Sequence, residues 1–95
     1  MRVGAIVQAR MGSTRLPGKV LRPIAGRPLL WHVVHRLKRC RTIDAIVIAT
    51  STNARDDAIE SFCREESIDF VRGPEDNVLA RFALAAEKSA ADVIV

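Results

Sequence analysis

The sequence has 95 residues, of which 48% are hydrophobic and 27% charged, a composition typical of one small globular domain. No apolar run reaches the roughly 18 residues that a membrane span needs, and the amino end does not look like a cleavable leader, so we expect a cytoplasmic protein. The net charge of +4 is unevenly placed. Ten Lys or Arg and no acid precede Asp44, whereas eleven acids and five bases lie from Asp44 onward, which indicates an anionic ligand for the first part.

Apolar segments and amphipathic segments alternate along the chain. In chain order we predict a strand over 2–9, a helix over 28–39, a strand over 44–50, a helix from 54, a strand over 68–71, a helix over 78–89 and a strand over 92–95. The strands are apolar from end to end, which is typical of a parallel sheet covered by helices on both faces. The prediction is an α/β fold of order βαβαβαβ.

Helical spacing of apolar residues predicts which face of each helix turns inward. The predicted inward residues are Leu30, Val33, Val34 and Leu37, then Ile59, Phe62 and Cys63, then Val78, Leu79, Phe82, Ala83 and Ala86. Caps for the second helix are offered by Ser51, Thr52 and Asn53. Two cysteines, Cys40 and Cys63, are too few for a disulfide framework, and both are predicted to be reduced and buried.

Three polar loops follow the first three predicted strands, at 8–20, 51–53 and 72–77. In open parallel sheets ligands bind beyond the carboxyl ends of the strands, so these loops are expected to share one functional edge. The chain stops at Val95, where a fourth such loop should begin. We therefore expect the domain to continue beyond that residue.

The first loop, QARMGSTRLPGKV, is not one of the common backbone cradles for phosphate. A Walker-type loop has four residues between its glycines and a Ser or Thr after its lysine. Here five residues separate Gly12 from Gly18, and Val20 follows Lys19. The stretch GSTRLPG also fails to match the Gly-x-Gly-x-x-Gly fingerprint of dinucleotide sites.

Side chains are therefore left to hold an anion in this loop. Arg10, Arg15 and Lys19 are spaced so that a curled loop can direct all three at one polyphosphate. Each charge-assisted hydrogen bond contributes roughly 1.5 to 3 kcal/mol. The supporting residues are Gly12 and Gly18 for close approach, Ser13 and Thr14 as donors, and Pro17 for a stiff turn. A solvated basic loop remains the alternative.

The stretch IVQARMGSTRLPGKVLRPIAGRPLLWHVVHRL resembles the opening of the sugar-nucleotide cytidylyltransferases, the family of the Kdo and acylneuraminate enzymes. The likeness rests on Ala9-Arg10, Ser13, the run RLPGK, Gly26 and Pro28, and is continued by IVIATS and VRGPEDNVLARF. Gln8 replaces the proline common before Ala-Arg in the Kdo and sialic acid enzymes, which favours the spore-coat-polysaccharide, SpsF-type branch. Residues 1–95 would then be the N-terminal nucleotide-binding portion of such an enzyme.

The resemblance implies a glycosyltransferase-A-like, Rossmann-like α/β fold that moves CMP from CTP to a sugar and releases pyrophosphate. It implies that Arg10, Ser13, Arg15 and Lys19 contact the triphosphate, with Arg10 and Lys19 as the catalytic cations. Ala9 and Gly12 would offer backbone to the nucleotide. The base and ribose would be framed by Thr50, Ser51, Arg72, Gly73 and Asp76.

The resemblance also implies a cofactor and an assembly. Mg²⁺ is expected, with its aspartate ligand beyond Val95, so the 95-residue chain should bind nucleotide weakly and without turnover. A homodimer, or association through the incomplete sheet, is expected as well.

Other residues that could carry chemistry receive plainer interpretations. His32, His35 and Cys40 offer three ligands at poor spacing, fewer than the four that a structural zinc site needs. Trp31 lies beside the inward stripe of its helix and is predicted to pack there instead of stacking on a base.

Three acids receive the same treatment. Asp56 and Asp57 are predicted to serve the positive end of a helix dipole, as acids in a first turn do. For Asp76, capping of the third helix and contact with a ribose both stay open.

Two rival classes stay open beside the cytidylyltransferase reading. One is a binding module for nucleotide or nucleic acid, although 4% aromatic residues and an acidic second part speak against nucleic acid. The other is a sugar transferase of the same fold. No membrane partner is expected.

Overall fold

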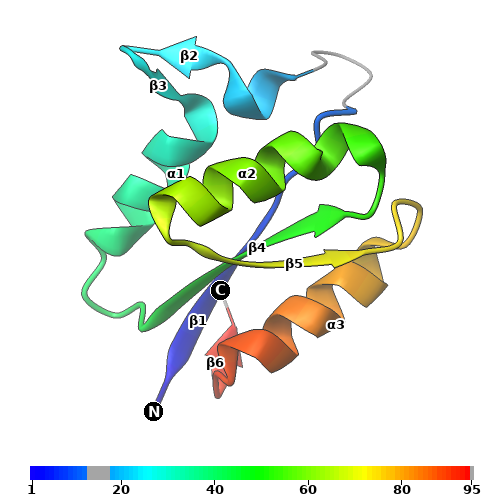
Figure 1. The fold of residues 1–95 in the computed structure, drawn as a ribbon. Helices are drawn as coiled ribbons and strands as arrows, with labels where there is room; N and C mark the ends of the chain where they lie inside the picture. The colour runs from blue at the N-terminus through cyan, green and yellow to red at the C-terminus, as the bar shows by residue number, and fades with distance from the viewer. Residues whose placement is uncertain (13–17, 95) are drawn as a thin grey trace.

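A computed structural model describes residues 1–12 and 18–94 (Figure 1). The main sheet has four strands, β1 (Val3–Gln8), β4 (Ala45–Ser51), β5 (Asp69–Gly73) and β6 (Val93–Ile94), in the order β5-β4-β1-β6. All of their pairings are parallel, so the predicted parallel sheet is confirmed.

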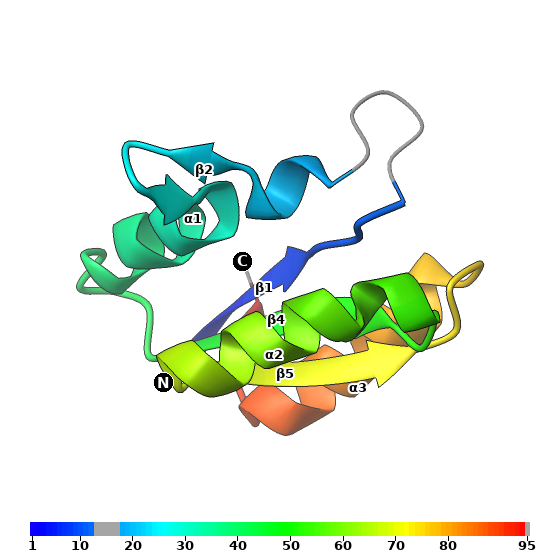
Figure 2. The same ribbon diagram turned by 45° about the horizontal axis from the view of Figure 1, so that its top comes forward.

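The helices also lie where the apolar periodicity predicts them. They are α1 (Leu29–Lys38), α2 (Asp57–Glu66) and α3 (Val78–Ser89), with short 3₁₀ turns η1 (Lys19–Leu21) and η2 (Ala54–Asp56). Helices α1 and α2 cover one face of the sheet and α3 covers the other (Figures 1 and 2). The predicted βαβαβαβ order is confirmed for the sheet strands and α-helices.

A small hairpin between η1 and α1 was not predicted. It pairs β2 (Pro23–Ile24) antiparallel with β3 (Arg27–Pro28), and Gly26 at φ 82 makes its turn. The His32 ring Nε2–H donates to the carbonyl oxygen of Ile24 at 2.6 Å, which docks the hairpin on α1. A search for apolar runs does not find this hairpin, because its strands are only two residues long and each contains a proline.

Trp31 packs, as predicted, in the layer between α1 and the hairpin. Its indole contacts the main core cluster and stacks on His35, with ring centroids 4.7 Å apart. The Arg27 guanidinium lies 4.9 Å from the indole centroid, a cation–π distance that ties the hairpin to the helix a second time.

The main core lies between β4 and the helices α1 and α2. Its buried residues are Ala9, Leu30, Val34, Ile48, Ile59, Phe62, Cys63 and Ile68. The predicted inward face of α2 is confirmed, as are Leu30 and Val34 on α1, and Leu37 is half-buried. The prediction for Val33 is wrong, because this residue lies on the outer side of α1 and is 37% exposed.

The predicted inward face of α3 is wrong. The helix buries Arg81, Ala85 and Ser89, whereas Val78, Leu79, Phe82 and Ala83 are exposed and Ala86 is half-buried. The reason is close packing: a Cβ built on Gly73 would lie 3.0 Å from Arg81 Cγ, and one on Gly4 would lie 3.2 Å from Ser89 Cβ. Small residues on both sides let helix and sheet approach, so the larger apolar side chains face outward.

The prediction that both cysteines are buried is half wrong. Cys63 lies in the core, but α1 ends at Lys38, so Cys40 falls in the following turn and is exposed.

Candidate functional site

Parallel pairing brings the ends of three strands to one edge of the sheet. Gln8 at the end of β1 is in register with Ala49 of β4, and Ser51 at the end of β4 is in register with Gly73 of β5. The loops after these strands therefore share an edge, as the sequence predicts. This edge is the candidate site.

The basic loop is closed at its base. The Gly18 N–H donates to the carbonyl oxygen of Met11 at 2.8 Å, and Gly18 has φ 74, a left-handed conformation that favours glycine. Arg10 and Lys19 directly flank the two joined residues, and both are exposed. The two predicted catalytic cations are thus placed at the neck of one loop.

Residues 13–17 lie outside the described part of the chain. The predicted contacts of Ser13 and Arg15, and the supporting roles of Thr14 and Pro17, fall on these residues and stay predictions.

A buried carboxylate fastens the neck of the loop to the end of β4. Asp56, which is 0% exposed, accepts the Met11 N–H on Oδ1 at 2.8 Å and the Ser51 hydroxyl on Oδ2. Ser51 Oγ in turn accepts the Asn53 N–H at 3.1 Å. A carboxylate that accepts these bonds fixes the backbone from which Arg10 and Gly12 project.

Sequence reasoning missed this role of Asp56. The residue was assigned to the helix dipole because it opens the helical segment after Asn53. Its bond to Met11 joins residues 45 positions apart, and no local pattern predicts such a contact. Of the three predicted caps, Ser51, Thr52 and Asn53, the structure uses Asn53, whose side chain accepts the Arg55 N–H at 3.0 Å.

Three of the predicted nucleotide-contacting residues form the floor of the edge. Ala9 is 2% exposed and its N–H donates to Ala49 O, while Thr50 and Ser51 are fully buried. The Thr50 hydroxyl has no hydrogen-bond partner among the described residues. Burial makes these residues a support beneath the loops, and their predicted contact with a nucleotide stays a prediction.

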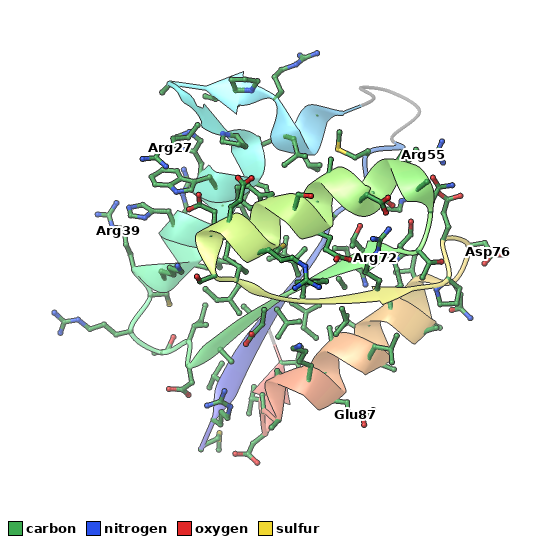
Figure 3. The ribbon with its side chains drawn as sticks, in the orientation of Figure 1. Arg27, Arg39, Arg55, Arg72, Asp76 and Glu87 are labelled. Carbon is green, nitrogen blue, oxygen red and sulfur yellow. The ribbon has the colours of Figure 1, made fainter. Side chains whose placement is uncertain are left out.

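Arg72, at the end of β5, braces the loop after β4. Its guanidinium donates to the carbonyl oxygens of Ser51 at 2.7 Å and Asn53 at 2.9 Å. It also pairs with Asp57 and Glu60 of α2 at 2.9 and 3.0 Å. The hydrogen bonds that Glu60 accepts from Arg72 and, to a smaller extent, from Arg64 lower the pKa of the Glu60 carboxyl. Arg72 thus holds α2, β4 and β5 together (Figure 3). Its predicted contact with a base or ribose stays a prediction.

An ion pair joins the loop after β5 to η2, and the arginine of that pair lies against the basic loop. Arg55 Nη2 lies 2.8 Å from Glu75 Oε2, and a Cβ on Gly12 would lie 2.7 Å from the Arg55 guanidinium carbon. Gly12 therefore leaves room for Arg55 beside the loop backbone, a packing use that the sequence did not predict. Figure 3 shows Arg55 and Asp76 on the same side of the molecule.

Asp76 is exposed in this loop and does not cap α3. The cap is Asn77, whose side chain accepts the Ala80 N–H at 3.0 Å, so the capping alternative for Asp76 is wrong. Contact with a ribose is the alternative that remains for it.

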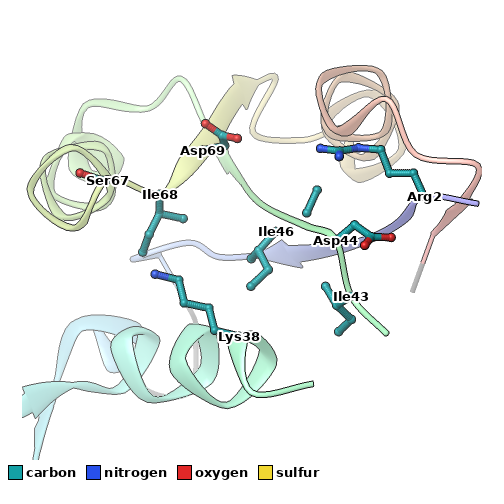
Figure 4. Close-up of a pocket in the computed structure, with 9 residues that line it drawn as sticks. Arg2, Lys38, Ile43, Asp44, Ile46, Ser67, Ile68 and Asp69 are labelled. Atoms are coloured by element: carbon teal, nitrogen blue, oxygen red, sulfur yellow. The ribbon is translucent and has the colours of Figure 1, made fainter. Parts of the chain in front are cut away.

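A cavity of about 300 Å³ lies near the opposite edge of the sheet, at the amino ends of β4 and β5 (Figure 4). It is lined by Arg2, Lys38, Asp44 and Asp69 among others. Arg2 donates to Ser89 O and Asp44 accepts the Val3 N–H, so these charges already tie the strand starts together. The cavity is remote from the three loops.

Two searches of residues 1–12 and 18–94 bear on metals and membranes. Within this part of the chain no three His, Cys, Asp or Glu side chains gather as a metal site would require. Nor does any helix in it combine the length and apolarity that crossing a bilayer demands. The His32 ring is hydrogen-bonded to the hairpin, and the His35 ring is stacked on Trp31.

Comparison with known proteins assigns the chain to a family. The cytidylyltransferase family model matches residues 4–95. The spore coat polysaccharide biosynthesis protein SpsF of Bacillus subtilis is 45% identical over 94 residues, which are 95% of this chain and 39% of that protein. The chain therefore spans about two fifths of the length of this relative.

Solved structures agree with the family match. A cytidylyltransferase from Leptospira borgpetersenii superposes with a TM-score of 0.89 and 34% identity, over 99% of this chain and 40% of the other. A CMP:2-keto-3-deoxy-manno-octonic acid synthetase complexed with CTP superposes with a TM-score of 0.77 and 26% identity, over 99% of this chain and 38% of the other. The resemblance and the Rossmann-like nucleotidyltransferase fold predicted from the sequence are confirmed.

Proposed function

The chain belongs to the cytidylyltransferase family, and from this membership we propose that its protein transfers CMP from CTP to a sugar and releases pyrophosphate. The observation that carries the proposal is the closed basic loop at the carboxyl edge of the sheet, with exposed Arg10 and Lys19 at its neck. A triphosphate is the part of CTP that such a pair of cations suits.

The reaction needs placement and charge stabilisation more than covalent chemistry. A sugar hydroxyl oxygen bonds to the α-phosphorus of CTP, the bond from that phosphorus to the β-phosphate oxygen breaks, and the hydroxyl proton is lost. Negative charge then grows on the departing pyrophosphate. We assign Arg10 and Lys19 to that charge, and Asp56 to holding the Met11 backbone next to Arg10 in place.

Mg²⁺ belongs to the proposal as a cofactor. Magnesium is usually held by one or two carboxylates together with substrate phosphates and water. The described residues bring no three ligating side chains together, and Asp76 is an exposed carboxylate at this edge. The described residues alone do not make a complete magnesium site.

The likeness to SpsF supports a sugar of a surface or spore-coat polysaccharide as acceptor. The proposal also includes a cytoplasmic location and a homodimer. A sugar transferase of the same fold and a non-catalytic nucleotide-binding module are the alternatives. Release of pyrophosphate from CTP that depends on an added acidic sugar distinguishes a cytidylyltransferase from both alternatives.

The test of the site uses Arg10→Ala and Lys19→Ala. Both side chains are exposed, so their removal should leave the melting temperature nearly unchanged. Each variant should bind CTP at least about fivefold more weakly, since each charge-assisted bond contributes roughly 1.5 to 3 kcal/mol. Isothermal titration calorimetry with CTP measures the effect.

Arg39→Ala is the matched control, because Arg39 is an exposed arginine at the end of α1. It should bind CTP as the unaltered protein does. Equal affinity in all four proteins would contradict the proposed site.

A further inference from the structure

Arg81 is a buried cation that the proposed reaction does not use. It lies in the second turn of α3 and is 2% exposed. Within residues 1–12 and 18–94, no carboxylate oxygen lies within 4.0 Å of its guanidinium nitrogens. Its partners are neutral: the carbonyl oxygens of Pro74 and Glu75, and the side-chain oxygen of Gln8.

Such an arrangement is costly for folding. A buried charge loses its hydration, and charged residues are seldom fully buried unless they are paired. A leucine or methionine would fill the same space on an apolar helix face without that cost. The hydrogen bonds of Arg81 must therefore supply something other than packing.

The bonds connect two of the three loops at the candidate site. Arg81 Nη1 donates to Pro74 O at 2.9 Å and Glu75 O at 2.6 Å, so one nitrogen holds two successive peptide units of the loop after β5. Arg81 Nε donates to Gln8 Oε1 at 3.2 Å, which joins that loop to the last residue of β1. Gln8 Nε2 in turn donates to Val78 O at 3.4 Å.

The connection continues outward to the basic loop. Glu75, whose carbonyl Arg81 holds, pairs through its side chain with Arg55 at 2.8 Å. The Arg55 guanidinium lies against Gly12. A path of direct contacts thus leads from the buried guanidinium to the loop that carries Arg10.

We propose that Arg81 is a positioning residue, which holds the loop after β5 in the one geometry that frames the nucleoside part of the nucleotide. This inference rests on the proposed function and deepens it. Asp76 follows Glu75 directly, so its placement at the edge depends on the two peptide units that Arg81 fixes. Arg81 itself touches no phosphate in this assignment.

The test compares the affinities of the full protein and its variants for CTP and for CMP. Arg81→Met keeps an unbranched apolar stem and removes the guanidinium fork, and Arg81→Lys keeps the charge. Because Arg81 acts on the nucleoside end, Arg81→Met should weaken CTP and CMP by the same factor, about tenfold or more, which one lost charge-assisted bond allows. Lys19→Ala should weaken CTP more than CMP. Arg81→Lys should recover thermal stability more than affinity, because an ammonium cannot span three acceptors.

Lys88→Met is the matched control, since it removes one positive charge from an exposed position on the same helix. If both Arg81 variants fail to fold, Gln8→Met replaces them in the test. It removes only the acceptor that β1 offers to Arg81, and Gln8 is an exposed residue. It should weaken both nucleotides equally by a smaller factor.

The outcomes are distinct. The inference is overturned if the folded Arg81 and Gln8 variants bind both CTP and CMP as tightly as the Lys88→Met control does. It is also overturned if these variants lose affinity for CTP alone. An unaltered protein that binds neither nucleotide defeats the proposed function, and this inference falls with it.

Discussion

The two cysteines differ in reactivity because their surroundings differ. Burial in the core raises the pKa of the Cys63 thiol to about 11, and the nearby Glu60 charge adds to the rise. Cys40 is exposed, and a hydrogen bond with the Thr42 hydroxyl at 3.2 Å lowers the pKa of its thiol. Only a thiolate attacks an alkylating reagent, so Cys40 should be modified in the folded protein at about pH 8, and Cys63 only after unfolding.

Mass spectrometry after a short treatment with iodoacetamide reads the sites directly. Cys40→Ser should then carry no label in the folded state and one label in denaturant. Rapid labelling of Cys63 in the native protein would contradict its burial.

At the scale of single residues, the sequence predicted what depends on near neighbours. The cap at Asn53 follows from a local motif and is confirmed. Arg10 and Lys19 also follow from a local motif; they flank the bonded pair Met11 and Gly18, and their catalytic role stays a prediction. Asp56 and Arg81 were not found as site residues. Their partners lie far along the chain, and a buried Asp or Arg cannot be told from a surface one by residue type.

At the scale of elements, Arg72 joins β5 to α2, and this brace should titrate in acid. Its bond to Glu60 lowers the pKa of that carboxyl below the ordinary 4.5. A carboxyl whose pKa is lower in the folded state than in the unfolded chain stabilises the fold above the unfolded value. That stability is lost as pH falls through the folded pKa. Unfolding free energy should therefore decrease from about pH 5 downward, and less steeply in Glu60→Gln.

Urea denaturation at a series of pH values measures this slope. Glu65→Gln is the control, because Glu65 is an exposed glutamate of the same helix. Asp57 also pairs with Arg72, so part of the acid sensitivity should persist in Glu60→Gln. Identical slopes in all three proteins would show that the brace does not contribute.

Helix α3 shows which properties of an element the apolar periodicity of the sequence predicts and which it does not. Its predicted bounds, 78–89, agree with the structure, because they depend on periodicity and on Asn77 as a local cap. Its predicted face is wrong, because the choice between two faces depends on what the sheet offers. Gly4 and Gly73 leave space for a close helix, and Ser89 lies against the first glycine and Arg81 against the second. Apolar periodicity carries no information about that fit.

At the scale of the molecule, one outer face is unusually apolar. Two helices cover one side of the sheet, whereas α3 alone covers the other (Figure 2). The exposed large apolar side chains on α3 are Val78, Leu79, Phe82 and Leu84, and Leu79 is 79% exposed. At 3.6 residues per turn, Val78, Leu79 and Phe82 lie within about 100° of one another around α3. Exposed apolar side chains gathered in this way favour association.

We therefore expect the 95-residue chain to self-associate through α3. The sequence also predicts self-association, but through the incomplete sheet. Sedimentation velocity should show a weight-average sedimentation coefficient that rises with concentration. Leu79→Glu together with Phe82→Glu places charges on the outer face of α3, which should abolish the rise while the circular dichroism spectrum stays unchanged. Val33→Glu, an equal change at an exposed apolar site on α1, should leave association intact. The two variants alter helices on opposite faces of the sheet. Association that survives both would place the self-association surface elsewhere than α3. A chain that stays monomeric at every concentration would contradict self-association altogether.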